Sequence, residues 1–177
     1  MAEQKEGSWR GRNRAYITAV VLAVMLTLFI SPEVMEDTSM SPAVPKGAVM
    51  LVNKQSYSAK RGSPDIGQVV VMEKNYAPKV SEDNIVARVV GGPGDLIEIR
   101  SGKLYRNGRS VSTSGSGGSL GSDRKVKVDR NSVYLLCDNH NSSTDSRNPR
   151  LGPVKLKEIK GDAVMLVWPF SHFGGID

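Results

Sequence analysis

Short runs of β-branched and aliphatic residues recur between turn residues over most of the chain beyond residue 47. The runs lie at residues 48–52, 67–72, 84–90, 96–100, 103–106, 125–128, 132–136 and 163–168. Apolar runs of this length, bounded by Gly, Pro, Asn or Asp, are typical of β-strands. The pair Asn107-Gly108 is flanked by short polar and apolar alternations, which predicts a hairpin. The sequence therefore predicts a mostly β domain.

The composition agrees with many short elements joined by turns. The chain of 177 residues has 18 glycines, 9 prolines and only 6% aromatic residues, and this length suits one domain better than two. Its single cysteine cannot form an internal disulfide, and one cysteine with two histidines cannot supply the usual number of zinc ligands. We therefore expect no metal and no cofactor, and we expect Cys137 to be a small buried residue.

The net charge of +6 does not indicate a nucleic-acid partner. Residues 1–14 contain four basic and two acidic residues, or +2, and the other 163 residues contain 20 basic and 16 acidic residues, or +4. This is a mild excess over a large surface, and no lysine-rich run interleaved with aromatic residues is present. We expect no nucleic acid among the partners.

An apolar segment near the start predicts a membrane anchor. Sixteen residues, Ala15 to Ile30, carry no charge. A helix of this length covers about 24 Å, a little less than the ~30 Å hydrocarbon core, and Pro32 limits its extension. Residues 31–37 contain no convincing small-x-small cleavage site, which favours a retained anchor over a removed signal peptide. We assign residues 15–32 to a single transmembrane helix.

The charges that flank this segment predict its orientation. Arginines at positions 10, 12 and 14 precede it, and acidic residues at positions 33, 36 and 37 follow it. The positive-inside rule then makes residues 1–14 a cytoplasmic tail and residues 33–177 an extracytoplasmic β-rich domain. Within that domain, residues 112–123 are rich in Gly and Ser and are expected to form a flexible loop between strands.

Four segments stand out as candidates to act together. They are DTSMSP at residues 37–42, RVVGGPGD at residues 88–95, the polar DNHNSSTDSRN at residues 138–148 and the apolar WPF at residues 168–170. In this order behind an N-terminal apolar segment, they resemble the type I signal peptidases, the membrane-bound serine endopeptidases that remove signal peptides from exported proteins. The resemblance covers about residues 15–173, and Arg61-Gly62 with residues 65–71 looks like a stretched form of the family's Arg-Gly-Asp-Val-Val strand.

The resemblance implies an antiparallel β catalytic domain behind one transmembrane helix, with a Ser/Lys dyad. Ser39 would be the nucleophile that forms an acyl-enzyme, and Met40 would line the shallow pockets that select small-x-small sequences. The family places its general-base lysine where this chain has Ala87. A methyl group cannot accept the serine proton, and loss of a general base costs about 10² to 10⁴ in rate. We therefore expect this exact sequence to cleave poorly or not at all.

The resemblance also implies supporting roles in the third segment. Ser143 matches the residue that hydrogen-bonds the lysine amine, Asp145 and Arg147 match an ion pair that holds the loop, and Asp138 matches a structural partner in it. His140 stands where the family has arginine and is expected to be a solvated loop residue.

The resemblance places the oxyanion hole at the backbone N–H of Ser39 and a second donor nearby. Asp37 occupies a position where the family has Gly or Ser, and an ionised carboxylate only accepts hydrogen bonds. The second donor is therefore in doubt.

Ala87 allows two interpretations. It replaces the lysine of an active parent enzyme, or the chain is a naturally non-cleaving relative that assists the assembly of surface pili. The presence of Ser39, Ser143, Asp145 and Arg147 favours the first interpretation. The resemblance implies signal peptides of exported preproteins, membrane lipid and the secretion translocon as partners, and a single-pass location in the cell membrane.

Overall fold

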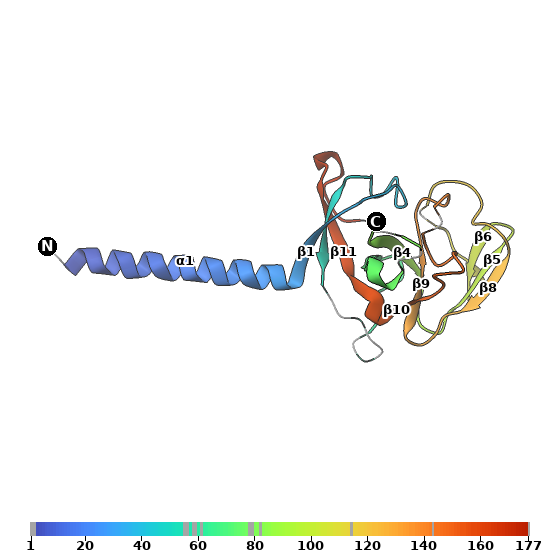
Figure 1. Cartoon of the computed structure of the whole chain (residues 1–177), viewed down its shortest axis with the longest axis horizontal. Helices are drawn as coiled ribbons and strands as arrows, with labels where there is room; N and C mark the ends of the chain where they lie inside the picture. Colours follow the sequence, from blue (N-terminus) through green and yellow to red (C-terminus); the bar gives the residue numbers. More distant parts are fainter. Residues whose placement is uncertain are drawn as a thin grey trace.

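The computed structural model describes residues 3–54, 57, 60, 62–77, 80–81, 83–113, 115–142 and 144–176. One long helix precedes two antiparallel β-sheets (Figure 1). The elements are α1 (Glu3–Phe29), β1 (Ile30–Val34), β2 (Val49–Asn53), β3 (Val69–Met72), η1 (Lys74–Tyr76), β4 (Ile85–Gly91), β5 (Leu96–Arg100), β6 (Lys103–Arg106), β7 (Arg109–Ser110), β8 (Arg124–Lys127), β9 (Ser132–Leu136), β10 (Val154–Lys155), η2 (Leu156–Glu158), β11 (Ile159–Trp168) and η3 (Phe170–His172). The predicted mostly β fold is confirmed, and its strand pairs are antiparallel.

The larger sheet positions the segments that the sequence singled out. Its strand order is β1-β2-β11-β3-β4-β9-β10. The chain between β1 and β2 contains residues 37–42, and the chain after β9 contains residues 138–147. Strand β4 lies between β3 and β9 and is buried at every position, as its nearly continuous apolar sequence suggests.

The smaller sheet contains the predicted hairpin. Its strand order is β7-β6-β5-β8. Asn107 and Gly108 connect β6 to β7 with φ values of 52° and 79°. Two consecutive positive φ values are those of a type I′ turn, which Asn-Gly adopts at little cost. In Figure 1 this sheet lies at the end of the molecule opposite α1.

The apolar core covers both faces of the larger sheet. In β3, Val70 and Met72 pack into one cluster while Val69 and Val71 pack into another, because successive side chains of a strand point to opposite faces. A third cluster joins the two sheets, with Tyr134 of β9 packed among side chains of the smaller sheet. The two sheets therefore share the third cluster.

The N-terminal helix differs from the expected anchor at both ends. It begins at Glu3 and ends at Phe29, whereas residues 30–32 belong to the edge strand β1. Pro32 fits an edge strand because it has no N–H to donate. The helix extends away from the sheets (Figure 1). No helix in the part of the chain that the structure describes is long and apolar enough to cross a membrane.

Candidate active site

Ser39 lies in the turn between β1 and β2 and is only 4% exposed. Its backbone N–H donates to Oδ1 of Asp37 at 2.8 Å. An Asp side chain commonly accepts from the backbone two residues later, and this contact shapes the turn. The N–H group expected to stabilise an oxyanion is therefore already bonded to a carboxylate. This corrects the expectation that the Ser39 N–H is an available donor.

Met40 follows Ser39 and is fully buried. It packs in the cluster that also contains Met50, Val52 and Val86. The structure thus places Met40 in the core beneath the turn, and its contact with a substrate side chain stays a prediction.

Asp138 forms a buried ion pair with Arg88 at the start of the loop that follows β9. Arg88 donates from Nε to Oδ1 at 3.0 Å and from Nη2 to Oδ2 at 2.7 Å, and from Nη1 to the carbonyl of Gly67 at 2.8 Å. Arg88 and Asp138 are 7% and 3% exposed. Asp138 thus bonds across to β4, next to Ala87, and its expected role in supporting the loop stays a prediction.

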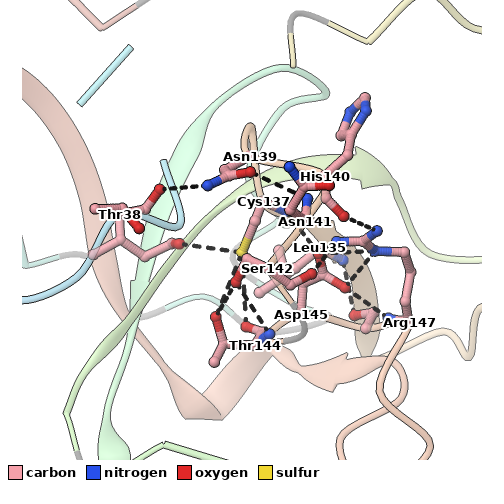
Figure 2. Close-up of polar contacts among 12 residues, drawn as sticks. Thr38, Leu135, Cys137, Asn139, His140, Asn141, Ser142, Thr144, Asp145 and Arg147 are labelled. Atoms are coloured by element: carbon pink, nitrogen blue, oxygen red, sulfur yellow. Dashed lines mark hydrogen bonds and ion pairs between the residues drawn. The ribbon is translucent and has the colours of Figure 1, made fainter. Parts of the chain in front are cut away.

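Asp145 and Arg147 form the second ion pair of this loop, as the resemblance implies. Nη2 of Arg147 lies 2.7 Å from Oδ2 of Asp145, and Asp145 is completely buried. Arg147 also donates to the carbonyls of His140 and Ser142, and Asp145 accepts from the N–H of Cys137 at 3.0 Å. Figure 2 shows these contacts closing the loop on itself. We call residues 138–147 the polar loop.

Asn139 joins the polar loop to the turn that contains Ser39. Its N–H donates to the Ser39 carbonyl at 2.8 Å, and its Nδ2 donates to the Thr38 carbonyl at 3.1 Å. Figure 2 shows the Asn139 side chain directed at Thr38. We call residues 37–42 the nucleophile segment. Asn139 thus joins two segments that are about a hundred residues apart in sequence.

Cys137 is a buried neighbour of Ser39 and Thr144, and it was not predicted from the sequence to belong to the site. Its thiol lies 3.8 Å from the hydroxyl of Thr144. Burial, together with the Asp145 carboxylate, raises its pKa to about 12, and hydrogen bonds with Thr144, Ser142 and Ser39 only partly offset this rise. The group is therefore a thiol at neutral pH and a poor nucleophile.

Ala87 packs in the same cluster as Cys137 and is fully buried on β4. Cys137 is thus a shared neighbour of Ala87 and Ser39. The expected Ser143 lies outside the described residues, so its role stays a prediction.

His140 is not the solvated residue that the sequence suggested. It is half-buried, and its Nε2 is inaccessible to solvent. Its ring lies against Gly115, because residues 115–117 run beside the polar loop. Within the Gly/Ser-rich stretch, Ser116 is therefore hydrogen-bonded to the polar loop. The composition gives no sign of this partner, and the flexibility of residues 112–123 stays a prediction.

Comparison with known proteins places the chain in a family. Residues 9–168 match the family described as signal peptidase, peptidase S26. The chain is 33% identical to signal peptidase I of Bacillus caldolyticus, covering 98% of both chains, and 30% identical to signal peptidase I S of Bacillus subtilis, covering 90% of this chain and 89% of the relative.

Among solved structures, a signal peptidase I from Enterococcus faecalis matches with a TM-score of 0.47 and 22% identity, covering 58% of this chain and 97% of that one. The family match spans most of the chain and includes the nucleophile segment, β4 and the polar loop. The chain belongs to the signal peptidase family of S26 peptidases, and by family it is a serine peptidase and therefore a hydrolase.

Proposed function

We propose that the protein is a form of a signal peptidase that removes signal peptides from exported preproteins, cleaving after small-x-small sequences, and that Ala87 leaves it with low or no activity. The observation that carries the proposal is the position of Ser39. It is bonded to the polar loop through Asn139 and contacts Cys137, which packs with Ala87. A longer side chain at position 87 would therefore lie beside Cys137, which is also a neighbour of Ser39.

In the proposed reaction, Ser39 Oγ attacks the carbonyl carbon at the junction and forms an acyl-enzyme, which water then hydrolyses. A lysine at position 87 would take the serine proton and return it to the leaving amine. The residues packed around position 87 are apolar. Burial among apolar side chains lowers the pKa of a lysine, so its amine would be neutral at working pH. The supporting ion pairs, Arg88 with Asp138 and Asp145 with Arg147, would keep the polar loop in place.

The test is Ala87→Lys, with Ala87→Met as its control. Methionine is similar in length to lysine but has no base, so it reproduces the packing change alone. We expect product from a synthetic signal peptide with alanine at the first and third positions before the junction, at least about 10²-fold faster with lysine than with alanine. Methionine should give no gain, and adding Ser39→Ala to the lysine variant should abolish the gain.

A folded lysine variant without activity would overturn this proposal. If that variant and the Ala87 chain both bind the signal peptide without turnover, the result would support the alternative of a non-cleaving helper in the assembly of surface pili. Equilibrium binding of the fluorescent peptide distinguishes this result from a loss of the binding site.

We also propose that residues 15–29 of α1, the helical part of the predicted anchor, attach the protein to the cell membrane, with the N-terminus in the cytoplasm and the β-rich domain outside. This proposal is supported by the uncharged sequence and by exposed apolar side chains, including Ile17, Leu22 and Phe29, on a helix that extends from the sheets (Figure 1). Membrane lipid and the secretion translocon, which delivers the substrates, would then be neighbours.

Protease added to spheroplasts should digest the outer domain and leave the N-terminal tail protected. A protected outer domain would overturn the orientation, and a mature chain that begins near residue 35 would overturn the attachment.

A further inference from the structure

We infer that residues 115–117, here called the Gly-Ser segment, hold the nucleophile segment in its position through the polar loop, and that this packing requires glycine at position 115. The catalytic consequence of this inference rests on the proposed function. The contacts themselves do not.

The Gly-Ser segment pairs with the polar loop through its backbone. The Ser116 N–H donates to the Asp138 carbonyl at 2.7 Å, and the His140 N–H donates to the Ser116 carbonyl at 2.9 Å. These two bonds form a parallel bridge between Ser116 and Asn139. The bridge flanks Asn139 on both sides and so restrains its backbone.

Asn139 transmits this restraint to the nucleophile segment. It donates its backbone N–H to the Ser39 carbonyl and its side-chain amide to the Thr38 carbonyl (Figure 2). A third contact is direct, because the Ser116 hydroxyl donates to the Ser41 carbonyl at 3.3 Å. The nucleophile is thus fixed from the side of the polar loop, and catalysis is sensitive to displacements of about 1 Å in such positions.

Gly115 allows this close approach. A Cβ atom at position 115 would lie 2.3 Å from Nε2 of His140 and 2.4 Å from the carbonyl oxygen of Asp138. Both distances are far below van der Waals contact, and the carbonyl belongs to the backbone that makes the bridge. Gly118 is in the same stretch and would meet nothing within 4 Å. Neither glycine has a left-handed φ, so the two positions differ in packing alone.

The experiment compares Gly115→Ala with Gly118→Ala by hydrogen exchange in the chain as it stands. We expect the amides of Ser116, Asn139 and His140 to exchange at least about tenfold faster in the first variant and unchanged in the second. Circular dichroism checks that both variants fold. Equal exchange in the two variants would overturn the inference, whatever the activity of the protein.

The same pair, made together with Ala87→Lys, tests the catalytic consequence. Gly115→Ala should lower kcat at least about tenfold with KM within about twofold, because a misplaced nucleophile impairs the chemical step more than binding. Gly118→Ala should leave both constants unchanged. Faster exchange without a fall in kcat would overturn the positioning role and leave the proposed function intact.

Asn139→Ala provides a second measure if Gly115→Ala does not fold. It removes the side-chain bonds to Thr38 and to the N–H of Asn141 and keeps the backbone bond to Ser39, so kcat should fall about severalfold while the bridge at Ser116 keeps its exchange rate. An unchanged kcat would overturn the positioning role. If the lysine variant is itself inactive, the proposed function fails, and exchange at Asn139 still decides whether the Gly-Ser segment holds the loop.

Discussion

Asp37 determines the state of the backbone N–H on which oxyanion stabilisation by Ser39 would depend. Its carboxylate accepts that N–H at 2.8 Å, so a developing oxyanion would have to compete with a full negative charge for the same donor. In the proposed reaction two positions would oppose cleavage, because Ala87 supplies no base and Asp37 occupies the Ser39 N–H. The sequence indicated that Ala87 is no base and that an ionised Asp37 cannot donate, and the structure adds that Asp37 accepts the N–H of Ser39.

Replacing Asp37 should therefore raise activity once lysine is present at position 87. We expect Asp37→Gly to increase kcat at least about tenfold, since a single oxyanion donor is worth about 10² to 10³ in rate. Asp37→Asn is the matched control, because its side-chain carbonyl still accepts the N–H and should give a smaller gain. Initial rates on the same signal peptide measure both. A gain for Asn equal to that for Gly would show that charge, rather than occupation of the N–H, is responsible.

Cys137 should make stability depend on alkaline pH. Burial raises its pKa to about 12, whereas the thiol of an unfolded chain titrates near ~8.5. Between these values the folded state binds more protons than the unfolded state, so stability is full below pH ~8.5 and falls as pH rises toward 12.

Urea unfolding at pH 8 and pH 10 should show this loss, at most about 1.4 kcal/mol per pH unit for this group. Cys137→Ala should lose less over the same interval. Tyr134, whose pKa burial also raises, is present in both chains, so the difference between them isolates the thiol. Identical losses in the two chains would contradict the assignment.

At the scale of elements, two features of the sequence predicted strands. Apolar runs bounded by turn residues predicted the fully buried strands, and the Asn-Gly pair predicted the hairpin that a tight turn closes. Strand β11 was underestimated because its first residues read as polar. It begins at Ile159 and passes a bulge at Gly161, where a Cβ atom would lie 2.0 Å from the Asn53 carbonyl. Only the tertiary approach of two backbones explains that glycine.

The same limit applies to the site. The motifs placed Ser39, Asp145 and Arg147 together because the family pattern links them. The docking of Ser116 was missed because a Gly/Ser-rich composition contains no signal of its partner.

The stability of the fold should depend on the ion pair inside the polar loop far more than on the hydroxyl of Ser39. Asp145 is completely buried, and Asp145→Ala would leave Arg147 without its carboxylate, a loss of about 3 to 5 kcal/mol for a buried pair. Ser39→Ala exchanges a hydroxyl for a methyl and should cost no more than about 1 kcal/mol. Urea denaturation of both variants and the parent chain measures the free energies of unfolding. Equal values would show that the carboxylate contributes nothing to the fold, and its supporting role would be withdrawn.

At the scale of the whole molecule, α1 leaves the sheets at β1, and β1 is therefore the point where the extended helix meets the folded domain (Figure 1). Strand β1 pairs with β2 from Ile30 opposite Asn53 to Val34 opposite Val49. Met35 continues this pairing with backbone bonds to Ala48 and Gly47, and its side chain is 2% exposed. The folded domain thus begins at Ile30, before the boundary at residue 33 that the sequence suggested.

This boundary predicts different outcomes for two truncated chains. Removal of residues 1–29 keeps β1 and should leave a soluble domain with the unfolding midpoint of the domain in the whole chain. Removal of residues 1–34 uncovers the edge of β2, and an uncovered edge strand favours pairing with other molecules. We expect the shorter chain to unfold at lower urea concentration and to form larger species in size-exclusion chromatography. If both chains have the same midpoint and size, β1 is dispensable, and the domain begins after Val34.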